Sequence, residues 1–154
     1  NDLERRYYYL FGPRSANDNP TVTLSFQVLP GDRAAVEFLG IPIRTMTFRQ
    51  GTMGVTGFRL GDLAYLSDIR EYPDSLLEDL KGVKQLVISA LRHTPSPLHF
   101  TVKEAVAFAQ RSEAERVWLT HVAHDLGHDQ TNGELPTHIR LAYDGLTLEF
   151  SAEL

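Results

Sequence analysis

The chain has 154 residues, 42% of them hydrophobic and 23% charged, and a formal net charge of −5 at pH 7. This composition suits one globular segment with its own core, and no run approaches the roughly 20 apolar residues of a membrane span. The lack of cysteine excludes disulfides and thiolate metal ligands and fits a cytoplasmic protein, while the acidic balance argues against a surface that coats nucleic acid.

The first thirty residues predict a helix end, a loop and a strand. Residues 3–11 are rich in Tyr, Leu and Phe and are expected to end a helix, which Gly12-Pro13 stops. A polar loop follows to Pro20. The alternation of β-branched and polar residues in 21–29 predicts a strand.

Two β-hairpins are expected next. Each pairs two short runs of alternating or β-branched residues across a turn that contains glycine. The first joins strands 34–38 and 41–48 across Leu39-Gly40, and the second joins strands 55–60 and 63–66 across Gly61-Asp62.

The second half of the chain predicts strand–helix–strand units. The run 73–80 opens with Pro and carries early acids, which is typical of a helix N-terminus. Thr101 and Glu104 match the capping-box spacing, so a helix is expected to about Gln110. The short apolar runs 85–88 and 117–119 predict buried strands on either side of that helix.

The C-terminal stretch predicts a polar loop and a last hairpin. Residues 130–136 are polar and are expected to be irregular. Strands 139–142 and 146–150 are expected to pair across Tyr143-Asp144-Gly145, because Asp-Gly is a strong turn signal. Hairpins first and strand–helix units later indicate the α/β (α+β) class, with a mixed sheet and flanking helices.

Polar, titratable side chains follow three of the expected strands. Asp68 follows the second hairpin, His99 lies in the loop after strand 85–88, and His121 follows strand 117–119. If these strands share a sheet and a direction, the three side chains meet at one edge. Each has a simpler interpretation: Asp68 as a turn or helix cap, His99 as a solvated loop histidine, and 121–128 as a wet loop rich in His.

The remaining histidines give weaker signals. His121 and His124 would share one face if the chain turned helical after Thr120, and neutral imidazole is the commonest metal ligand. His93 and His138 are interpreted as structural or surface residues, and His128 as exposed. Gly51-Thr-Met-Gly54 lacks the Lys-Ser/Thr ending of a phosphate loop, and there is no Gly-x-Ser-x-Gly or Cys nucleophile.

The order of several motifs resembles a known family. Gln50-Gly-Thr-Met-Gly, then Tyr-Leu-Ser-Asp68, Leu-Thr-His121-x-x-His124 and Ala-Tyr-Asp144-Gly are similar to the C-terminal half of a metallo-β-lactamase-fold hydrolase. The closest branch is the phosphonate-pathway cyclic phosphodiesterase and tRNA 3′-processing type. The resemblance covers about 45–150. It implies that 1–154 is one segment of an αββα four-layer sandwich and that the N-terminal half, with its His-x-His-x-Asp-His motif, is not present.

The resemblance also implies roles for individual residues. Asp68 corresponds to the carboxylate that bridges two divalent metal ions, Zn or Mn, and His121 to a ligand of the second ion. His124 corresponds to a ligand of a structural zinc site shared with N-terminal cysteines, and His99 to the general acid at the scissile phosphate. Gln50 stands where the family usually has a histidine ligand, and an amide oxygen is a weaker ligand than imidazole.

Two functions of different classes follow. In the first, the full-length protein is a metal-dependent phosphodiesterase that uses a dinuclear metal-activated hydroxide on a phosphodiester-type small molecule or RNA. In the second, the chain is an inactive or truncated half that acts as a binding or self-associating module, as Gln50 suggests.

One sheet face should be bare in a single layer of that sandwich. The missing half or a second copy of the chain is expected to cover it, because such an apolar face is unusual for a soluble monomer. This face is expected to include several of Val22, Leu24, Phe26, Val28, Ile43, Val55, Phe58 and Leu63.

Overall fold

The computed structural model describes residues 2–11 and 27–152, which fall in two compact units, 1–30 and 31–154. The first unit holds the helix α1 (Asp2–Arg6) and the single 3₁₀ turn η1 (Tyr8–Leu10), so the expected helix end is present but short. Most of the predicted strand 21–29 lies outside the described residues, and 27–29 is not strand. Within the described residues no helix is long and apolar enough to cross a membrane.

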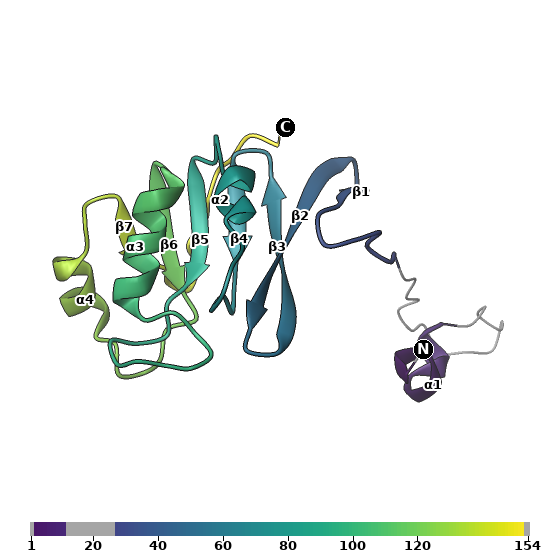
Figure 1. Cartoon of the computed structure of the whole chain (residues 1–154), viewed down its shortest axis with the longest axis horizontal. Coiled ribbons are helices and arrows are strands. Elements are labelled where there is room, and N and C mark those ends of the chain that lie inside the picture. Colours follow the sequence, from purple (N-terminus) through teal and green to yellow (C-terminus); the bar gives the residue numbers. More distant parts are fainter. Residues whose placement is uncertain (1, 12–26, 153–154) are drawn as a thin grey trace. The chain divides into compact units, whose positions relative to one another are not determined.

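The second unit is built on one mixed, seven-stranded sheet (Figure 1). Its strands follow one another in chain order, antiparallel from β1 to β4 and parallel from β4 to β7. This confirms the predicted α/β class with a mixed sheet. The strands are β1 (Ala35–Phe38), β2 (Ile41–Gln50), β3 (Met53–Leu60), β4 (Leu63–Leu66), β5 (Gln85–Ser89), β6 (Arg116–Thr120) and β7 (Ile139–Leu141).

Both predicted hairpins are confirmed, and glycine is required in each turn. Leu39 and Gly40, between β1 and β2, have φ values of 51° and 80°. Gly61, between β3 and β4, has a φ of 56°, and a Cβ there would collide with the carbonyl oxygen of Ser151. The turn therefore needs glycine both for its left-handed backbone and for the C-terminal segment that lies against it.

One face of the sheet carries the core. The helices α2 (Ser75–Asp79) and α3 (Val102–Ser112) lie on this face (Figure 1). Alternate strand residues meet them, so the side chains of one parity along each strand are buried. The fully buried ones include Phe48, Leu66, Ile88, Leu119 and Leu141.

The helix α3 begins at the predicted capping box. The backbone N–H of Glu104 donates to the Thr101 hydroxyl at 3.2 Å, and the Thr101 backbone N–H donates to the Glu104 carboxylate at 2.8 Å. Partial burial raises the pKa of Glu104, but the hydrogen bonds that the carboxylate accepts from the Thr101 backbone N–H, the Thr101 hydroxyl and Arg70 outweigh this effect and hold the pKa below its ordinary value. The ionised carboxylate is thus the form that the folded state prefers.

The Glu104→Gln variant should lose stability in a pH-dependent way. Because the folded-state pKa is lowered, Glu104 stabilises the fold above its unfolded pKa, and this contribution disappears as pH falls through the folded value. Urea unfolding at roughly pH 7 and pH 3 should show a difference in unfolding free energy between wild type and variant, and this difference should be smaller at the lower pH. A gap equal at both pH values would contradict the expectation.

Two predictions for the C-terminal stretch are wrong. Residues 128–134 form the helix α4 (His128–Glu134), not a loop, because Thr131 is buried and the Asn132 side chain accepts a hydrogen bond from the Leu141 backbone N–H. The turn at Tyr143–Gly145 exists, with Gly145 at a φ of 88°, but 146–150 is not strand. The strand β7 instead pairs parallel with β6.

The opposite sheet face presents a row of larger side chains. Strand register places Phe58, Tyr65, Val87 and Trp118 side by side across β3 to β6. Phe58 is 38% and Tyr65 43% exposed, and the other two are partly buried.

Only some of the residues predicted for the bare face lie on it. Phe58 is exposed, and Ile43 and Leu63 are partly buried. Val55 lies instead against the core on the other face, because it pairs with the buried Phe48. Val28 is exposed in the first unit, and Val22, Leu24 and Phe26 lie outside the described residues.

Candidate metal centre at the strand ends

Asp68 lies just past the end of β4 in a left-handed backbone conformation, with a φ of 61°. The residue after it, Ile69, is fully buried and its backbone N–H donates to the Ser89 hydroxyl at 3.3 Å. The Ser67 hydroxyl donates to the Asp68 carboxylate at 3.1 Å. The sharp turn at the strand end therefore fixes where the carboxylate points.

His99 is placed by backbone bonds on both sides of Phe100. The Phe100 backbone N–H donates to the Ile69 carbonyl at 3.2 Å, and its carbonyl accepts from Leu91 at 2.9 Å. Phe100 itself is buried. The loop after β5 is thus tied next to Asp68, which brings His99 beside that carboxylate.

His121 follows β6 and repeats the conformation of Asp68, with a φ of 59°. The Ala90 backbone N–H donates to the Thr120 carbonyl, and the Ala123 backbone N–H donates to the Leu91 carbonyl. Residues 121–127 are irregular, so His121 and His124 do not share a helix face, and the loop interpretation of 121–128 holds up to Gly127.

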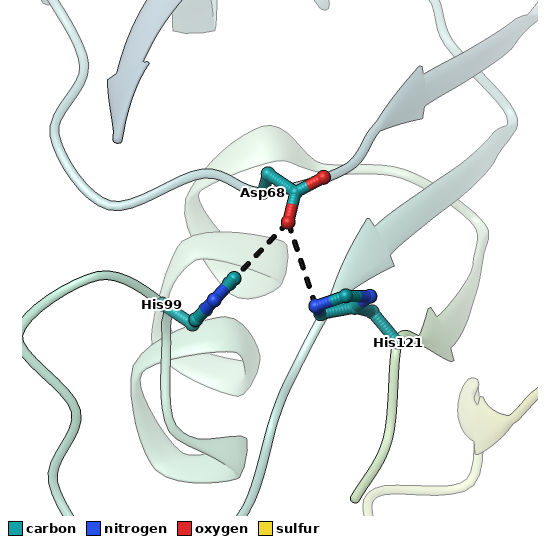
Figure 2. A group of neighbouring side chains, drawn as sticks. All are labelled: Asp68, His99 and His121. Atoms are coloured by element: carbon teal, nitrogen blue, oxygen red, sulfur yellow. Dashed lines mark ion pairs between the residues drawn. The ribbon is translucent and has the colours of Figure 1, made fainter. Parts of the chain in front are cut away.

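The three side chains converge on one carboxylate oxygen (Figure 2). Asp68 Oδ1 lies 3.5 Å from His99 Nδ1 and 3.4 Å from His121 Nε2, and the imidazole centroids are 4.9 Å apart. The prediction that Asp68, His99 and His121 cluster at one edge of one sheet is confirmed. The parallel strands β4, β5 and β6 end at this edge, and each precedes one of the three residues.

Gln50 ends β2 and reaches into the cluster. Its amide nitrogen lies 3.3 Å from Asp68 Oδ1 and 3.3 Å from both ring nitrogens of His99. An amide nitrogen is a donor, so in this orientation Gln50 bonds to the acceptors of the cluster and offers no ligand atom. Rotation of the amide by 180° would place its oxygen there instead.

The electrostatics of the cluster favour neutral His99. Desolvation by burial lowers the pKa of His99, as do His121 and Arg92, and Asp68 raises it less than the others lower it. A neutral imidazole has a free ring lone pair, which is the form that coordinates a cation.

The donor set fits a divalent metal ion. One carboxylate oxygen and one nitrogen from each imidazole lie within 4.8 Å of one another. Ligands about 2.1 Å from a tetrahedral ion stand roughly 3.4 Å apart, close to the spacings from Asp68 Oδ1. Asp68 and His121 could therefore hold a divalent metal ion, with a third nitrogen from neutral His99 and at least one position left for further ligands.

Zinc added to the isolated 154-residue chain should bind weakly or not at all. The chain matches only Asp68 and His121 to catalytic ligands, His99 adds a third nitrogen, and a closed tetrahedral site needs four. Titration followed by histidine ring NMR signals measures this. Tight, stoichiometric binding to the monomer would show that these donors suffice.

The other predicted ligand and histidines lie elsewhere. His124 is exposed in the turn after His121 and does not join the cluster, so its structural-zinc role stays a prediction. His93 is exposed and His138 partly buried, in keeping with their structural or surface interpretation. His128 is exposed, as predicted, and begins α4.

Arg92 is a neighbour of the site whose importance the sequence did not reveal. Its Nε is buried and has no hydrogen-bond partner among the described residues. Its carbonyl accepts from the Val102 backbone N–H at 3.0 Å, and its guanidinium lies near enough to His99 to lower that imidazole's pKa. Only the packed structure shows that a cation with an unsatisfied donor stands here.

Comparison with known proteins gives a consistent family. Residues 1–122 match the family model described as the beta-lactamase superfamily domain. The chain is 33% identical to a solved structure described as a new diphosphatase from the PhnP family, with a TM-score of 0.82. The match covers 97% of this chain and 55% of that one.

Two further matches differ in scope. The metallo-beta-lactamase fold protein YhfI from Bacillus subtilis is 17% identical, with a TM-score of 0.65 over 92% of this chain and 59% of that one, and supports the fold alone. An octanoyltransferase from Porphyromonas gingivalis is 30% identical over 148 residues, which are 94% of this chain and 29% of that protein. The chain thus spans little more than half of these solved relatives, and less of the octanoyltransferase.

Proposed function

Because the chain belongs to the beta-lactamase superfamily domain family, we propose that it forms part of a metal-dependent hydrolase that cleaves phosphoric ester or anhydride bonds. The carrying observation is the Asp68–His99–His121 cluster at the ends of parallel strands. The diphosphatase named among its relatives supports the phosphoryl substrate class. We draw no activity from the octanoyltransferase, since the match covers only 29% of that protein.

The cluster residues would have different roles in the reaction. Asp68 can offer an oxygen to each of two cations, and His121 a nitrogen to one of them. Divalent ions held there would supply a hydroxide nucleophile and neutralise phosphoryl charge. His99 has its Nδ1 3.5 Å from the same carboxylate oxygen and would protonate the leaving oxygen. In this role it would be protonated and would not be a metal ligand, and the negative charge of a bound phosphoryl group would favour that form over the neutral one of the empty cluster.

Gln50 and Arg92 would shape how this site handles an anion. Gln50 is neutral and gives a weaker ligand than imidazole, so we propose that it loosens one of the two ions. Among the described residues the buried Nε of Arg92 has no hydrogen-bond acceptor, and the positive charge of its guanidinium would attract a phosphoryl group to this side of the cluster.

Hydrolysis by the longest natural form of the protein tests the proposal. Bis(p-nitrophenyl) phosphate and a dinucleoside diphosphate represent the diester and anhydride classes, each assayed with Zn²⁺ or Mn²⁺ and after chelation. We expect metal-dependent turnover of at least one substrate and loss of turnover in the His99→Asn variant. A metal-loaded, folded protein that cleaves neither compound would refute the function.

A second candidate function, a self-associating module, is favoured by the face that carries Phe58 and Tyr65. Both aromatic side chains are more than one-third exposed although they lie on inner strands of the sheet. We propose that the remainder of the protein or a second copy of the chain covers this face. A second copy would have to present the same patch to itself.

The isolated chain should therefore associate or bind a hydrophobic dye. The paired substitution of Phe58 and Tyr65 by serine should reduce both signals, because it removes two exposed aromatic side chains from that face. Light scattering and dye fluorescence measure the two effects. The matched control is Met53→Ser, since Met53 is 59% exposed but its register on β3 places it on the other face. A well-folded wild-type monomer that binds no dye would contradict this expectation.

A further inference from the structure

Arginines gather at the other end of β2, away from the metal cluster. Arg44 lies near the start of β2 and Gln50 at its end, so these two residues are roughly 20 Å apart along the strand. A cavity of about 230 Å³ opens beside Arg44. Its lining residues are Arg33, Ala34, Ala35, Arg44, Thr45, Met46, Arg59 and Asp79.

Arg44 and Arg59 are direct cross-strand partners between β2 and β3. Like charges placed opposite each other on a sheet are destabilising. Burial lowers the pKa of Arg59, and Arg44 lowers it further. The two positive charges repel each other when the site is empty, and an anion between the two guanidinium groups would offset this repulsion.

Arg59 is held in place by the protein itself. Its Nε donates to the Gly61 carbonyl at 2.8 Å, and its Nη1 donates to the carbonyls of Asp79 and Lys81 at 2.6 and 2.8 Å. Asp79 and Lys81 lie at and just after the end of the helix α2, and Gly61 lies in the β3–β4 turn, so Nε and Nη1 have a structural role. Its Nη2 has no partner among the described residues and is preorganised for a ligand.

The only carboxylate at this cavity is already engaged. Arg33 forms an ion pair with Asp79, while the exposed Arg44 has no ion pair or side-chain hydrogen bond within the described parts of the chain. Three guanidinium groups and one carboxylate leave a formal charge of +2 on a chain whose net charge is −5. The charge of the cavity is thus opposite in sign to the net charge of the chain.

We propose that this cavity is a second binding site, specific for a phosphate-sized dianion, with Arg44 and Arg59 as its principal ligands. The class is phosphate because a dianion matches the +2 charge, and its tetrahedral oxygens can accept from the guanidinium fork of Arg44 and from the remaining Nη2 of Arg59. The source is either free inorganic phosphate or the terminal group of a phosphomonoester. The site is separate from the proposed hydrolytic centre.

The test is titration of the chain with inorganic phosphate, methyl phosphate and acetate at constant ionic strength, followed by arginine side-chain NMR. Phosphate should shift the Arg59 and Arg44 Nε signals with saturation, and acetate should bind more weakly. Equal affinities for phosphate and methyl phosphate would assign the site to the monoester group, and a preference for phosphate to the free ion.

Three variants sharpen the test. Arg44→Gln should weaken phosphate binding by about 10-fold or more, and Arg44→Lys should recover part of it. Arg116→Gln is the matched control, because Arg116 is exposed on β6 and does not line this cavity. Unchanged affinity in folded Arg44→Gln would overturn the proposal.

The outcome is independent of the hydrolase proposal. Asp68→Asn should leave phosphate binding at Arg44 intact, since the two sites lie at opposite ends of β2. Phosphate binding that depends on Asp68 and not on Arg44 would place the ligand at the strand-end cluster and refute the second site.

Discussion

The Asp68→Asn variant of the longest natural form should retain its fold and lose roughly 10³-fold in kcat/KM for the phosphoryl substrate. Asp68 supplies the one carboxylate of the cluster, 3.4 and 3.5 Å from the two imidazoles. Asparagine keeps the shape but presents a neutral oxygen, which is a poor ligand and cannot balance two cations. Bound metal per chain should fall together with the rate.

Asp125→Asn is the matched control for that experiment. Asp125 is exposed in the loop after His121 and makes the same change of charge without joining the cluster. Its rate and metal content should equal those of the wild type. An Asp68→Asn protein that keeps both would show that Asp68 is only a turn residue, which is the simpler interpretation of its position.

The Leu119→Ala variant should lose about 2–5 kcal/mol of unfolding free energy. Leu119 is fully buried in β6, between its register partners Ile88 and Leu141. Truncation leaves a cavity that a sheet held on both sides by neighbouring strands closes poorly. Because His121 follows two residues later, the metal site should also loosen.

Urea denaturation measures the loss, with Val122→Ala as its control. Val122 is 39% exposed and follows the same strand, so its truncation should change stability by only about 0.5 kcal/mol. Leu119→Ala and Val122→Ala variants of equal stability would mean that β6 is not part of the cooperative core.

The hairpins and α3 could be predicted from the sequence because their signals are local. Leu39, Gly40 and Gly61 adopt positive φ in the turns, and Thr101 with Glu104 completes its hydrogen bonds within three residues. The helix α4 could not, since His128–Glu134 has no apolar periodicity and depends on Asn132 bonding to β7. The prediction of a last hairpin was wrong because a turn signal specifies the turn and not the strand that follows it.

The three central residues of the site and their meeting at one sheet edge could be predicted, but the contacts around them could not. Polar residues after short buried runs indicated Asp68, His99 and His121, because parallel strands end at one sheet edge. The approach of Gln50 to His99 depends on the length of β2, which extends two residues beyond its predicted end. The unsatisfied Nε of Arg92 depends on packing between distant loops, for which a single sequence carries no pattern.

The left-handed backbone at Asp68 and His121 reduces the stability of the fold, while the side chains at these positions serve the proposed reaction. A residue with a Cβ in this conformation lowers the free energy of unfolding by about 1–3 kcal/mol. Glycine would avoid this loss, and both turns would keep their shape. Selection of random variants for heat resistance alone should therefore enrich glycine at these two positions, and selection for turnover should exclude it. The two screens would separate residues kept for chemistry from those kept for folding.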